Sequence, residues 1–314
     1  VCSYGSMLNS LAPLRESIVM SLWGWLGRRL TLLEESPQHA KLLRLESPLL
    51  SLEQLQQIEN ITDTAFRSAR VRCLWDKKDG IPGHARALTA IYNQVEAAIR
   101  KGATLVILTD KGQDDEHVPV PMLQAVAFTH HELIRNGLRM RASLIAETGT
   151  AFDGHTFATL IGYGAAAVCP YLAWHAIAMA VRSGELEGVT VDEAWARFRT
   201  GMEQDYLKIM AKRGVSTHPS YNGAQMFTAL GIGRKLIKQC FRGTTSVVSG
   251  IENEQIAKDC LERHNAAYQS LSPIVLKQSG EIHALPPAPG REAHAITSFF
   301  VKAMYRFRAT QQRE

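Results

Sequence analysis

The segment from Met140 to Leu172 constrains the fold of this chain more than any other stretch of the sequence. An apolar run from Ala142 to Ala146 and a second from Ala165 to Val168 enclose an amphipathic segment bounded by glycines. This pattern predicts two buried strands joined by a helix. Since antiparallel neighbours could be joined by a tight turn, a helical crossover indicates parallel strands and therefore an α/β fold.

Strands and helices alternate in the same way upstream of this segment. We expect strands at Ala69–Trp75 and Ala103–Leu108 with a helix at Gly83–Arg100 between them, and a further helix from Pro121 to about Asn136. The polar run Gln113–His117 is expected to be a loop. Together the pattern predicts α/β architecture: an incomplete (β/α) barrel-like parallel sheet of about four strands, surrounded by helices and flanked by helical arms.

The remainder of the chain is expected to be mostly helical. We divide it into an N-terminal helical arm (1–65), a central α/β domain (66–250) and a C-terminal helical or irregular extension (251–314). The last stretch, 293–314, fits either a basic amphipathic helix or a frayed tail. Expected helices downstream of the opening segment are Ala173–Arg182, Thr190 to about Ile209, Gly223–Leu230, Gly233–Phe241 and Glu252–His264.

Composition excludes several function classes. The hydrophobic fraction of 46% suffices for a globular core, and no window approaches the ~20 apolar residues of a membrane span. The net charge is +5, but basic residues are mixed with acidic ones, so we expect no nucleic-acid partner and no membrane partner. The five cysteines lie far apart, which favours free thiols without a disulfide and a cytoplasmic location. The chain begins at Val1, and we expect it to be a piece of something longer.

Three motifs that resemble chemical sites are better explained by structure. Gly162 and Gly164 match part of a dinucleotide fingerprint, but here a helix precedes and a strand follows, the reverse of a phosphate loop. His130 and His131 are adjacent on an expected helix and point about 100° apart, so they cannot chelate one ion together. Cys2 is preceded by Val1 and is not a terminal nucleophile. We therefore expect no catalytic, metal-binding or cofactor-binding residue in this chain.

Polar side chains follow the expected parallel strands at their carboxyl ends, where α/β proteins build their sites. Carboxylates at such positions either function there or cap the helix that follows. The same edge receives the residues that end the last strand. The candidates for contacts between domains are Asp110, Glu147, Thr148, Gly149, Pro170 and Tyr171.

A second candidate is the hydroxyl-rich segment from Ser216 to Tyr221, which lies between two expected helices. Ser220 or Tyr221 can begin the following helix as part of a capping turn. The same hydroxyl groups, including that of Ser216, can line a polar path or contact a neighbouring domain. The residues leave these two alternatives open.

Four blocks of sequence resemble the central domain of the glutamate synthase large subunit. They are Ser17–Ser51, Ala103–Gly112, Arg141–Ala173 and Lys208–Ile232, and they occur in the order of the family. The resemblance covers about Leu11–His264.

This resemblance carries implications for fold and function. The family joins a glutamine amidotransferase domain, this central domain, an FMN-binding barrel with an iron–sulfur cluster, and a β-helical domain. Ammonia from the first site travels internally to 2-oxoglutarate at the flavin, so that glutamine and 2-oxoglutarate give two molecules of glutamate in nitrogen assimilation. The central domain is similar to a flavin-type barrel without its cofactor. The resemblance thus implies that the candidate residues contact the amidotransferase and FMN domains or border the ammonia path.

The chain departs from the family pattern in several places. Asn9–Pro13 replaces the usual proline-rich approach to the first block, Arg213–Ser216 replaces a Met-Gly-Ile-Ser loop, and Gly280–His283 retains only part of the continuation into the FMN domain. The amidotransferase, FMN and iron–sulfur segments are missing, so this chain alone is not expected to make glutamate. The alternatives are a stand-alone (β/α) lyase or flavin oxidoreductase with Glu147 as its acid or base, and a fragment without a function of its own.

Overall fold

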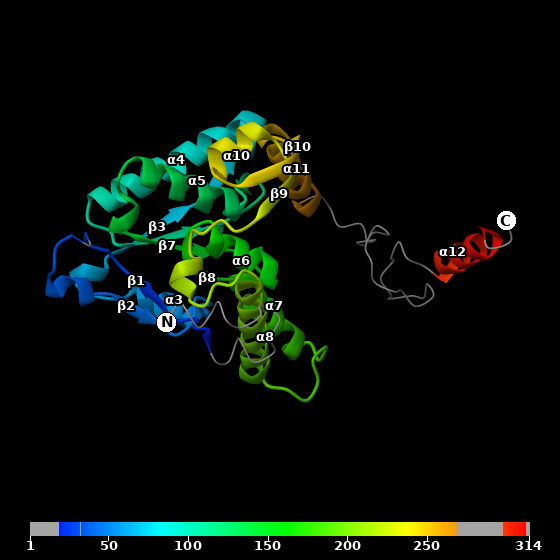
Figure 1. The fold of residues 1–314 in the computed structure, drawn as a ribbon, viewed down its shortest axis with the longest axis horizontal. Helices are drawn as coiled ribbons and strands as arrows, with labels where there is room; N and C mark the ends of the chain where they lie inside the picture. Colours follow the sequence, from blue (N-terminus) through cyan, green and yellow to red (C-terminus); the bar gives the residue numbers. More distant parts are fainter. Residues whose placement is uncertain (1–18, 32, 269–297, 312–314) are drawn as a thin grey trace. The chain divides into compact units, whose positions relative to one another are not determined.

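The structure is a computed structural model that describes residues 19–31, 33–268 and 298–311. The chain divides into two compact units, Val1–Ala266 and Ala267–Glu314. The first unit contains the sheet and the helices around it (Figure 1). In the second, helix α12 spans Ser298–Gln311, within the stretch for which the sequence allowed a helix or a tail. Residues 293–297 and 312–314 of that stretch lie outside the described residues.

A four-stranded parallel sheet forms the centre of the first unit. Its strands are β3 (Ser68–Arg72), β5 (Leu105–Thr109), β7 (Ser143–Glu147) and β8 (Ala165–Cys169), and their order in the sheet follows the chain. Every residue of β5 and β7 is buried, as expected for strands covered on both faces. The predicted parallel sheet surrounded by helices is confirmed.

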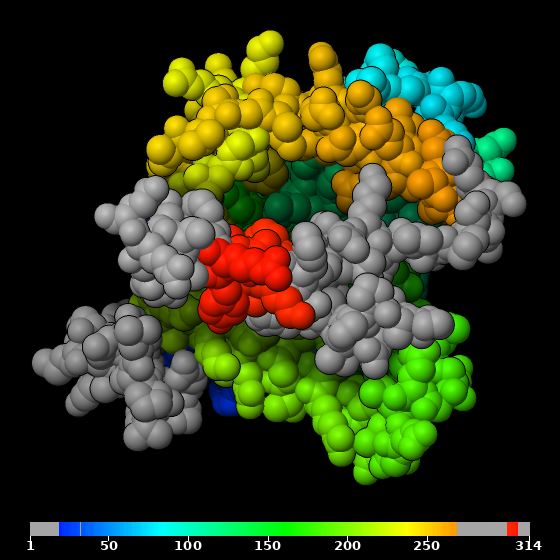
Figure 2. All heavy atoms as spheres, turned by 90° about the vertical axis from the view of Figure 1, so that its right-hand side faces the viewer, coloured from blue at the N-terminus to red at the C-terminus, as the bar shows by residue number. Residues whose placement is uncertain are grey.

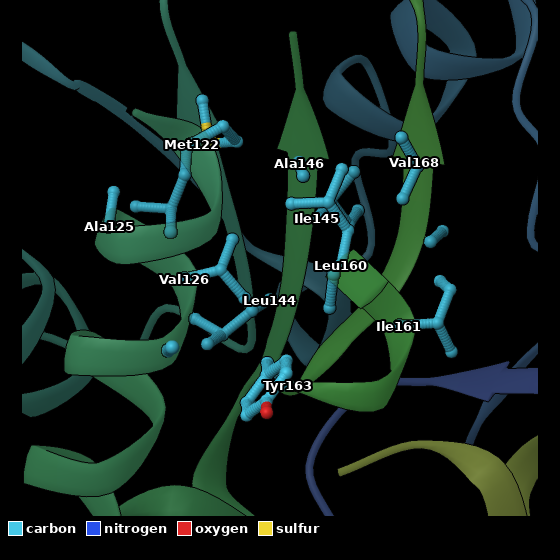
Figure 3. Packing of buried hydrophobic residues seen from close by; sticks show 14 of the residues in the cluster. Met122, Ala125, Val126, Leu144, Ile145, Ala146, Leu160, Ile161, Tyr163 and Val168 are labelled. Atoms are coloured by element: carbon cyan, nitrogen blue, oxygen red, sulfur yellow. The ribbon is translucent and has the colours of Figure 1, made fainter. Parts of the chain in front are cut away.

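Helices connect successive strands and supply a large share of the core. Methyl and thioether groups of the α5 helix lie against β7, and α6 packs beside β8 (Figure 3). Helix α8 packs against both α6 and α7. It begins with a capping box in which Thr190 and Glu193 bond each other's backbone amides, which explains its sharp start. These helices are α4 (Gly80–Arg100), α5 (Met122–Arg135), α6 (Gly154–Gly162), α7 (Tyr171–Arg182) and α8 (Val191–Lys212).

The N-terminal segment differs from the predicted helical arm, because it also contains strands. Strands β1 (Gly24–Leu26) and β2 (Leu43–Leu45) pair in antiparallel fashion, and α3 (Leu52–Glu59) supplies the expected helix. Three-residue strands are too short to show a periodicity in the sequence. Two 3-10 turns, η1 (Pro37–Ala40) and η2 (Thr64–Phe66), complete the segment.

The same N-terminal segment protects one edge of the sheet. Leu49 forms an isolated parallel bridge with Val168 of β8, because the Leu50 amide donates to the Val168 carbonyl at 2.9 Å and the Val168 amide donates to Pro48 at 2.8 Å. An otherwise unpaired strand edge is thereby covered. Leu26, Leu49 and Leu50 are buried in the same hydrophobic cluster as the sheet.

The strand predicted at Ala69–Trp75 is two strands, so that prediction was wrong in its extent. The chain leaves the sheet at Cys73, whose carbonyl accepts from the Val120 amide at 2.8 Å. Beyond it, β4 (Leu74–Asp76) pairs antiparallel with β6 (His117–Pro119), partly within the stretch expected to be a loop. A 3-10 turn, η3 (Lys77–Asp79), then leads into α4.

The C-terminal part of the first unit contains a two-stranded parallel ribbon that the sequence did not reveal. The helix predicted at Gly223–Leu230 was wrong, because residues Thr228–Ile232 form β9, which pairs with β10 (Thr245–Ile251). Most side chains of β10 are exposed, so no alternating apolar pattern marks it. The predicted helices α10 (Arg234–Cys240) and α11 (Asn253–Tyr268) are confirmed. Figure 2 shows these yellow and orange elements as a continuous band.

Two short elements complete the unit, η4 (Arg139–Arg141) before β7 and α9 (His218–Tyr221) before β9. In the described part of the chain, no helix combines the length and the apolar character needed to cross a membrane. The cysteines described there are free thiols: Cys73, Cys169, Cys240 and Cys260.

Candidate functional site

The carboxyl ends of three adjacent strands bring one set of predicted site residues together. Thr109 of β5 pairs with Glu147 of β7, which in turn pairs with Cys169 of β8. The residues that follow these strand ends therefore share one edge, which we call the carboxyl edge. It contains Asp110, Glu147, Thr148, Gly149, Pro170 and Tyr171.

Glu147 is the centre of an ion-paired cluster at this edge. Its residue is 1% exposed, yet one carboxylate oxygen lies 2.9 Å from Lys111 Nζ and the other accepts from Arg70 Nη1. Arg70 also donates from Nε and Nη2 to the carboxylate of Glu59, at 2.9 and 2.7 Å. Two carboxylates and two cationic side chains thus form one network of ion pairs. Arg70, Lys111 and Glu59 were not predicted from the sequence, although Lys111 directly follows Asp110.

The surroundings of Glu147 keep its carboxylate ionised. Burial alone would raise the pKa of Glu147, but hydrogen bonds from Thr109 and Lys111 and the charges of Arg70 and Lys111 together lower it below its ordinary value. An acid–base residue must exchange protons with a substrate near neutral pH. A buried carboxylate with both oxygens ion-paired and a lowered pKa is better suited to holding the strand ends in place than to acid–base catalysis.

Asp110 holds the loop that follows β7. Thr148 Oγ1 donates to its carboxylate at 2.5 Å, the Gly149 amide donates at 3.1 Å, and the Tyr171 hydroxyl donates as well. Burial raises the pKa of Asp110, those hydrogen bonds oppose the rise, and the charge of Glu147 adds to it. The carboxylate therefore connects the end of β5, the loop after β7 and the start of α7.

Large apolar side chains lie outside this polar network. Phe152 is 66% exposed three residues after Gly149, and Leu172 is 51% exposed next to Tyr171. A Cβ atom added at Gly149 would lie 3.5 Å from Leu172 Cβ, so loop and helix pack closely here. The carboxyl edge therefore combines a hydrogen-bonded and ion-paired interior with two exposed apolar side chains, beside the partly exposed Lys111.

The segment Ser216–Tyr221 lies at the opposite end of the sheet. The His218 ring Nε2 is 3.1 Å from the carbonyl oxygen of Ala166, near the start of β8, whereas Tyr171 follows the end of that strand. The structure therefore does not bring this segment together with Asp110 and Glu147. The Ser216 carbonyl accepts from the Ser21 amide at 2.9 Å, which attaches the segment to the N-terminal chain.

The hydroxyl groups of this segment differ in exposure, because Tyr221 is buried whereas Ser220 is exposed. Ser220 Oγ lies 2.8 Å from Thr217 Oγ1 within the turn itself. Tyr221 is 1% exposed and packs edge-on against Tyr206, with ring centroids 5.3 Å apart. Its hydroxyl has no hydrogen-bond partner among the described residues. Ser220 and Tyr221 end α9 and strand β9 follows, so the prediction that one of them begins the next helix as a capping turn was wrong.

The glycine and histidine motifs form a packed structural unit. Gly164 has a φ of +116°, and a Cβ atom there would overlap the ring of His130. Arg139 donates from Nε to His130 Nδ1 at 2.8 Å and from Nη2 to the Gly164 carbonyl at 2.9 Å. No group of three or more His, Cys, Asp or Glu side chains suited to a metal ion occurs within residues 19–31, 33–268 and 298–311.

Comparison with known proteins gives the family of this chain. A family model described as the glutamate synthase central domain matches residues 10–233. The chain belongs to this family. The resemblance based on the four sequence blocks is thereby confirmed.

The curated relatives are glutamate synthases from several kingdoms. The chain is 35% identical to an NADH glutamate synthase of Schizosaccharomyces pombe over 86% of its own length and 13% of that protein's. It is 36% identical to the NADPH glutamate synthase large chain of Bacillus subtilis, covering 87% of this chain and 18% of the relative. For a ferredoxin-dependent glutamate synthase of Pyropia yezoensis the identity is 33%, with coverages of 94% and 20%. The chain thus spans a fifth or less of these relatives.

Solved structures resemble this chain only distantly. A flavocytochrome b2 variant with bound sulfite matches at a TM-score of 0.35 and 15% identity, covering 73% of this chain and 47% of that one. A mandelate oxidase variant matches at 0.34 and 11%, covering 68% and 91%. At such scores these likenesses carry no argument about function.

Proposed function

We propose that this chain acts within a glutamate synthase as the domain that connects the glutamine amidotransferase domain to the FMN domain, without a catalytic residue of its own. The observation that carries this proposal is the carboxyl edge, where a closed ion-paired network supports exposed apolar side chains at Phe152 and Leu172. Exposed apolar surface on a rigid base is typical of a surface that binds another protein domain.

The length of the relatives supports the same proposal. This chain matches only 13 to 20% of the three glutamate synthases described above, so most of such an enzyme is available to cover the edge. In this scheme FMN and the iron–sulfur cluster are bound by other segments, and ammonia passes along the carboxyl edge on its way to the flavin. The enzyme would work in the cytoplasm in nitrogen assimilation. The electron donors named for the relatives differ, so the donor is a property of the other segments.

The proposal can be tested in a chimera in which this chain replaces the matching segment of the Bacillus subtilis large chain. Phe152→Asp combined with Leu172→Asp places charges on the apolar surface of the edge. We expect the glutamate formed per glutamine hydrolysed to fall at least severalfold, because the domains no longer dock tightly and ammonia escapes. The measurement is the ratio of the two products under steady turnover.

Met179→Asp provides a matched control, because Met179 is 68% exposed on the same helix as Leu172 but two turns further along. We expect this variant to keep the coupling of the parent chimera. Unchanged coupling in the double variant, or an equal loss in both, would overturn the assignment of the carboxyl edge.

A further inference from the structure

A cavity lies at the amino ends of the strands, far from the carboxyl edge along the sheet. Its volume is about 180 Å³, and its wall includes Ser143 and Ala166 at the starts of β7 and β8. The chain that follows β1 closes one side, because Gly27 and Ser143 exchange hydrogen bonds between backbone and hydroxyl at 3.1 and 3.3 Å. The cavity is thus built from the sheet and from the N-terminal segment.

Two arginines give this cavity a positive charge. Arg29 and Arg139 both line it, with His130, His218 and Asn222. Arg139 donates to His130 Nδ1 and to the carbonyl oxygens of Ala142 and Gly164, all neutral acceptors. Among the described residues no carboxylate forms an ion pair with Arg29 or Arg139, and no acidic residue lines the cavity. Two neighbouring cations therefore have no counter-charge there.

The energetics of this pair favour an anion. Burial lowers the pKa of Arg139 to about 10, and the charge of Arg29 lowers it further in the same direction. Close cations without an acid destabilise each other, whereas a guanidinium forms its strongest hydrogen bonds with carboxylate or phosphate oxygens. Asn222 and Ser143 also line the cavity, but Asn222 Nδ2 donates to the carbonyls of Ala165 and Ile161 and Ser143 Oγ donates to the carbonyl of Gly27, so the guanidinium groups are the donors for such a ligand.

The size of the cavity limits the ligand. A volume of about 180 Å³ is room for a small molecule, since a water molecule in the liquid occupies about 30 Å³. A wider groove of about 610 Å³ adjoins it, shares Arg29 and Met140 with it, and also carries Arg28 and Arg141. The groove also contains one carboxylate, that of Glu34, against three arginines, so its approach from solvent is mainly cationic.

We propose that the cavity between Arg29 and Arg139 is a binding site for a small oxyanion, a carboxylate or a phosphate. The anion would accept hydrogen bonds from both guanidinium groups. The site is independent of the connecting role proposed above, because it lies at the other end of the strands.

Calorimetric titration of the 314-residue chain with inorganic phosphate and with malonate, at low ionic strength, tests this site. We expect saturable binding of one equivalent of at least one probe, and the tighter probe identifies the preferred oxyanion. Arg29→Glu should weaken binding at least tenfold, because it removes a cation and adds an internal carboxylate beside Arg139. It should also raise the thermal midpoint by roughly 2 °C in the absence of ligand.

Arg28→Glu is the matched control, because it makes the same charge change one residue away, at a side chain that lines the groove but not the cavity. Its affinity for the probes should stay within about threefold of the parent, which is the limit expected for a change in general surface charge. Arg29→Met provides a second variant that removes the cation without adding a carboxylate, and it too should lose binding. No saturable binding of either probe, or an equal loss in Arg28→Glu and Arg29→Glu, would overturn the proposal.

Discussion

The two ends of the same parallel sheet differ in whether their charged side chains are paired with the opposite charge. At the carboxyl edge, Glu147 is buried and pairs with Arg70 and Lys111. At the amino end, Arg29 and Arg139 line a cavity without a carboxylate from the described residues. Glu147 is buried and already paired, so the first cluster is complete within the chain, whereas Arg139 is half-buried and Arg29 exposed without such a pair, which leaves the second open to an anion. The pairing of charges thus distinguishes the structural network at the carboxyl edge from the binding site proposed at the amino end.

The two histidines that line the cavity at the amino end add no positive charge to it. Burial, and the charges of Arg139 and His131, lower the pKa of His130 to about 3. Burial likewise lowers the pKa of His218 to about 4, against the hydrogen bond with the Ala166 carbonyl, and the charge of Arg29 adds to the effect. Both rings are therefore neutral at pH 7, and the arginines alone supply the positive charge of the cavity.

The largest expected effect comes from Gly164→Ala, which tests whether the wall of the cavity is closely packed. The new methyl group would overlap the His130 ring at a positive φ, so both backbone strain and displacement of the ring oppose it. We expect a loss of about 3 kcal/mol in the free energy of unfolding, measured by urea denaturation.

Gly184→Ala isolates the backbone part of this effect, because Gly184 has a φ of +81° with nothing within 4 Å of an added Cβ. Its cost should be about 1 kcal/mol. Equal costs at the two glycines would mean that His130 is free to move, and the cavity would lose its preformed wall.

Glu147→Gln tests the opposite end of the sheet. It keeps the size of the side chain but removes the charge that Arg70 and Lys111 share. We expect a loss of about 2 kcal/mol, below the ~3–5 kcal/mol of a fully buried pair because both cations are partly exposed. Glu96→Gln disrupts the exposed pair with Arg100 on α4 and should cost far less. If the two variants lost the same free energy of unfolding, the ion pairs of Glu147 would not stabilise the carboxyl edge more than an exposed pair stabilises a helix.

The pH dependence of stability tests the second acid of this edge. Because burial raises the pKa of Asp110, the folded state holds this proton more tightly than the unfolded chain does. Its contribution to stability is complete below the unfolded pKa of about 3.9 and is lost as pH rises through the raised folded pKa. Glu147 has the opposite sign, because its pKa is lowered and its contribution is lost as pH falls. Between pH 4 and 7, the free energy of unfolding should therefore fall less in Asp110→Asn than in the parent. The same dependence on pH in both proteins would contradict a raised pKa of Asp110.

The smallest effect is expected at Tyr221→Phe. The Tyr221 hydroxyl is buried without a hydrogen-bond partner in the described part of the chain, so its removal should change the free energy of unfolding by about 0 kcal/mol or raise it slightly. Tyr163→Phe breaks a 2.7 Å hydrogen bond with Thr244 and should cost about 1 kcal/mol. A loss at Tyr221 as large as at Tyr163 would reveal a partner for that hydroxyl.

Much of the fold could be predicted from the sequence because its strongest signals are local. The apolar runs at Ala103–Leu108 and Ala142–Ala146 predicted the buried strands β5 and β7, and Thr190 marks the start of α8. The exposed strand at Thr245–Ile251 and the three-residue strands of the N-terminal segment carry no such pattern, so they were missed. Their pairing depends on contacts with distant residues, which a local pattern does not contain.

The candidate sites could be predicted only in part, for the same reason. Asp110 and Glu147 were found because the carboxyl ends of parallel strands meet at one edge. Arg70 is 77 residues from Glu147, and Arg29 is far from Arg139 in sequence, so only the folded chain brings these charges together. The position of Ser216–Tyr221 at the other end of β8 follows from the contact of His218 with Ala166 and of the next residue after the segment, Asn222, with Ala165, which no spacing in the sequence indicates.

The most direct test of the difference between the two ends is an NMR titration of the isotope-labelled chain at constant ionic strength, with inorganic phosphate or malonate, whichever binds more tightly. We predict saturable shifts of the backbone amides of Gly27, Ser143 and Asn222 at the amino end, and no change at Thr148, Gly149 and Tyr171. Shifts centred on the carboxyl edge, or no saturable shift at the amino end, would contradict the account.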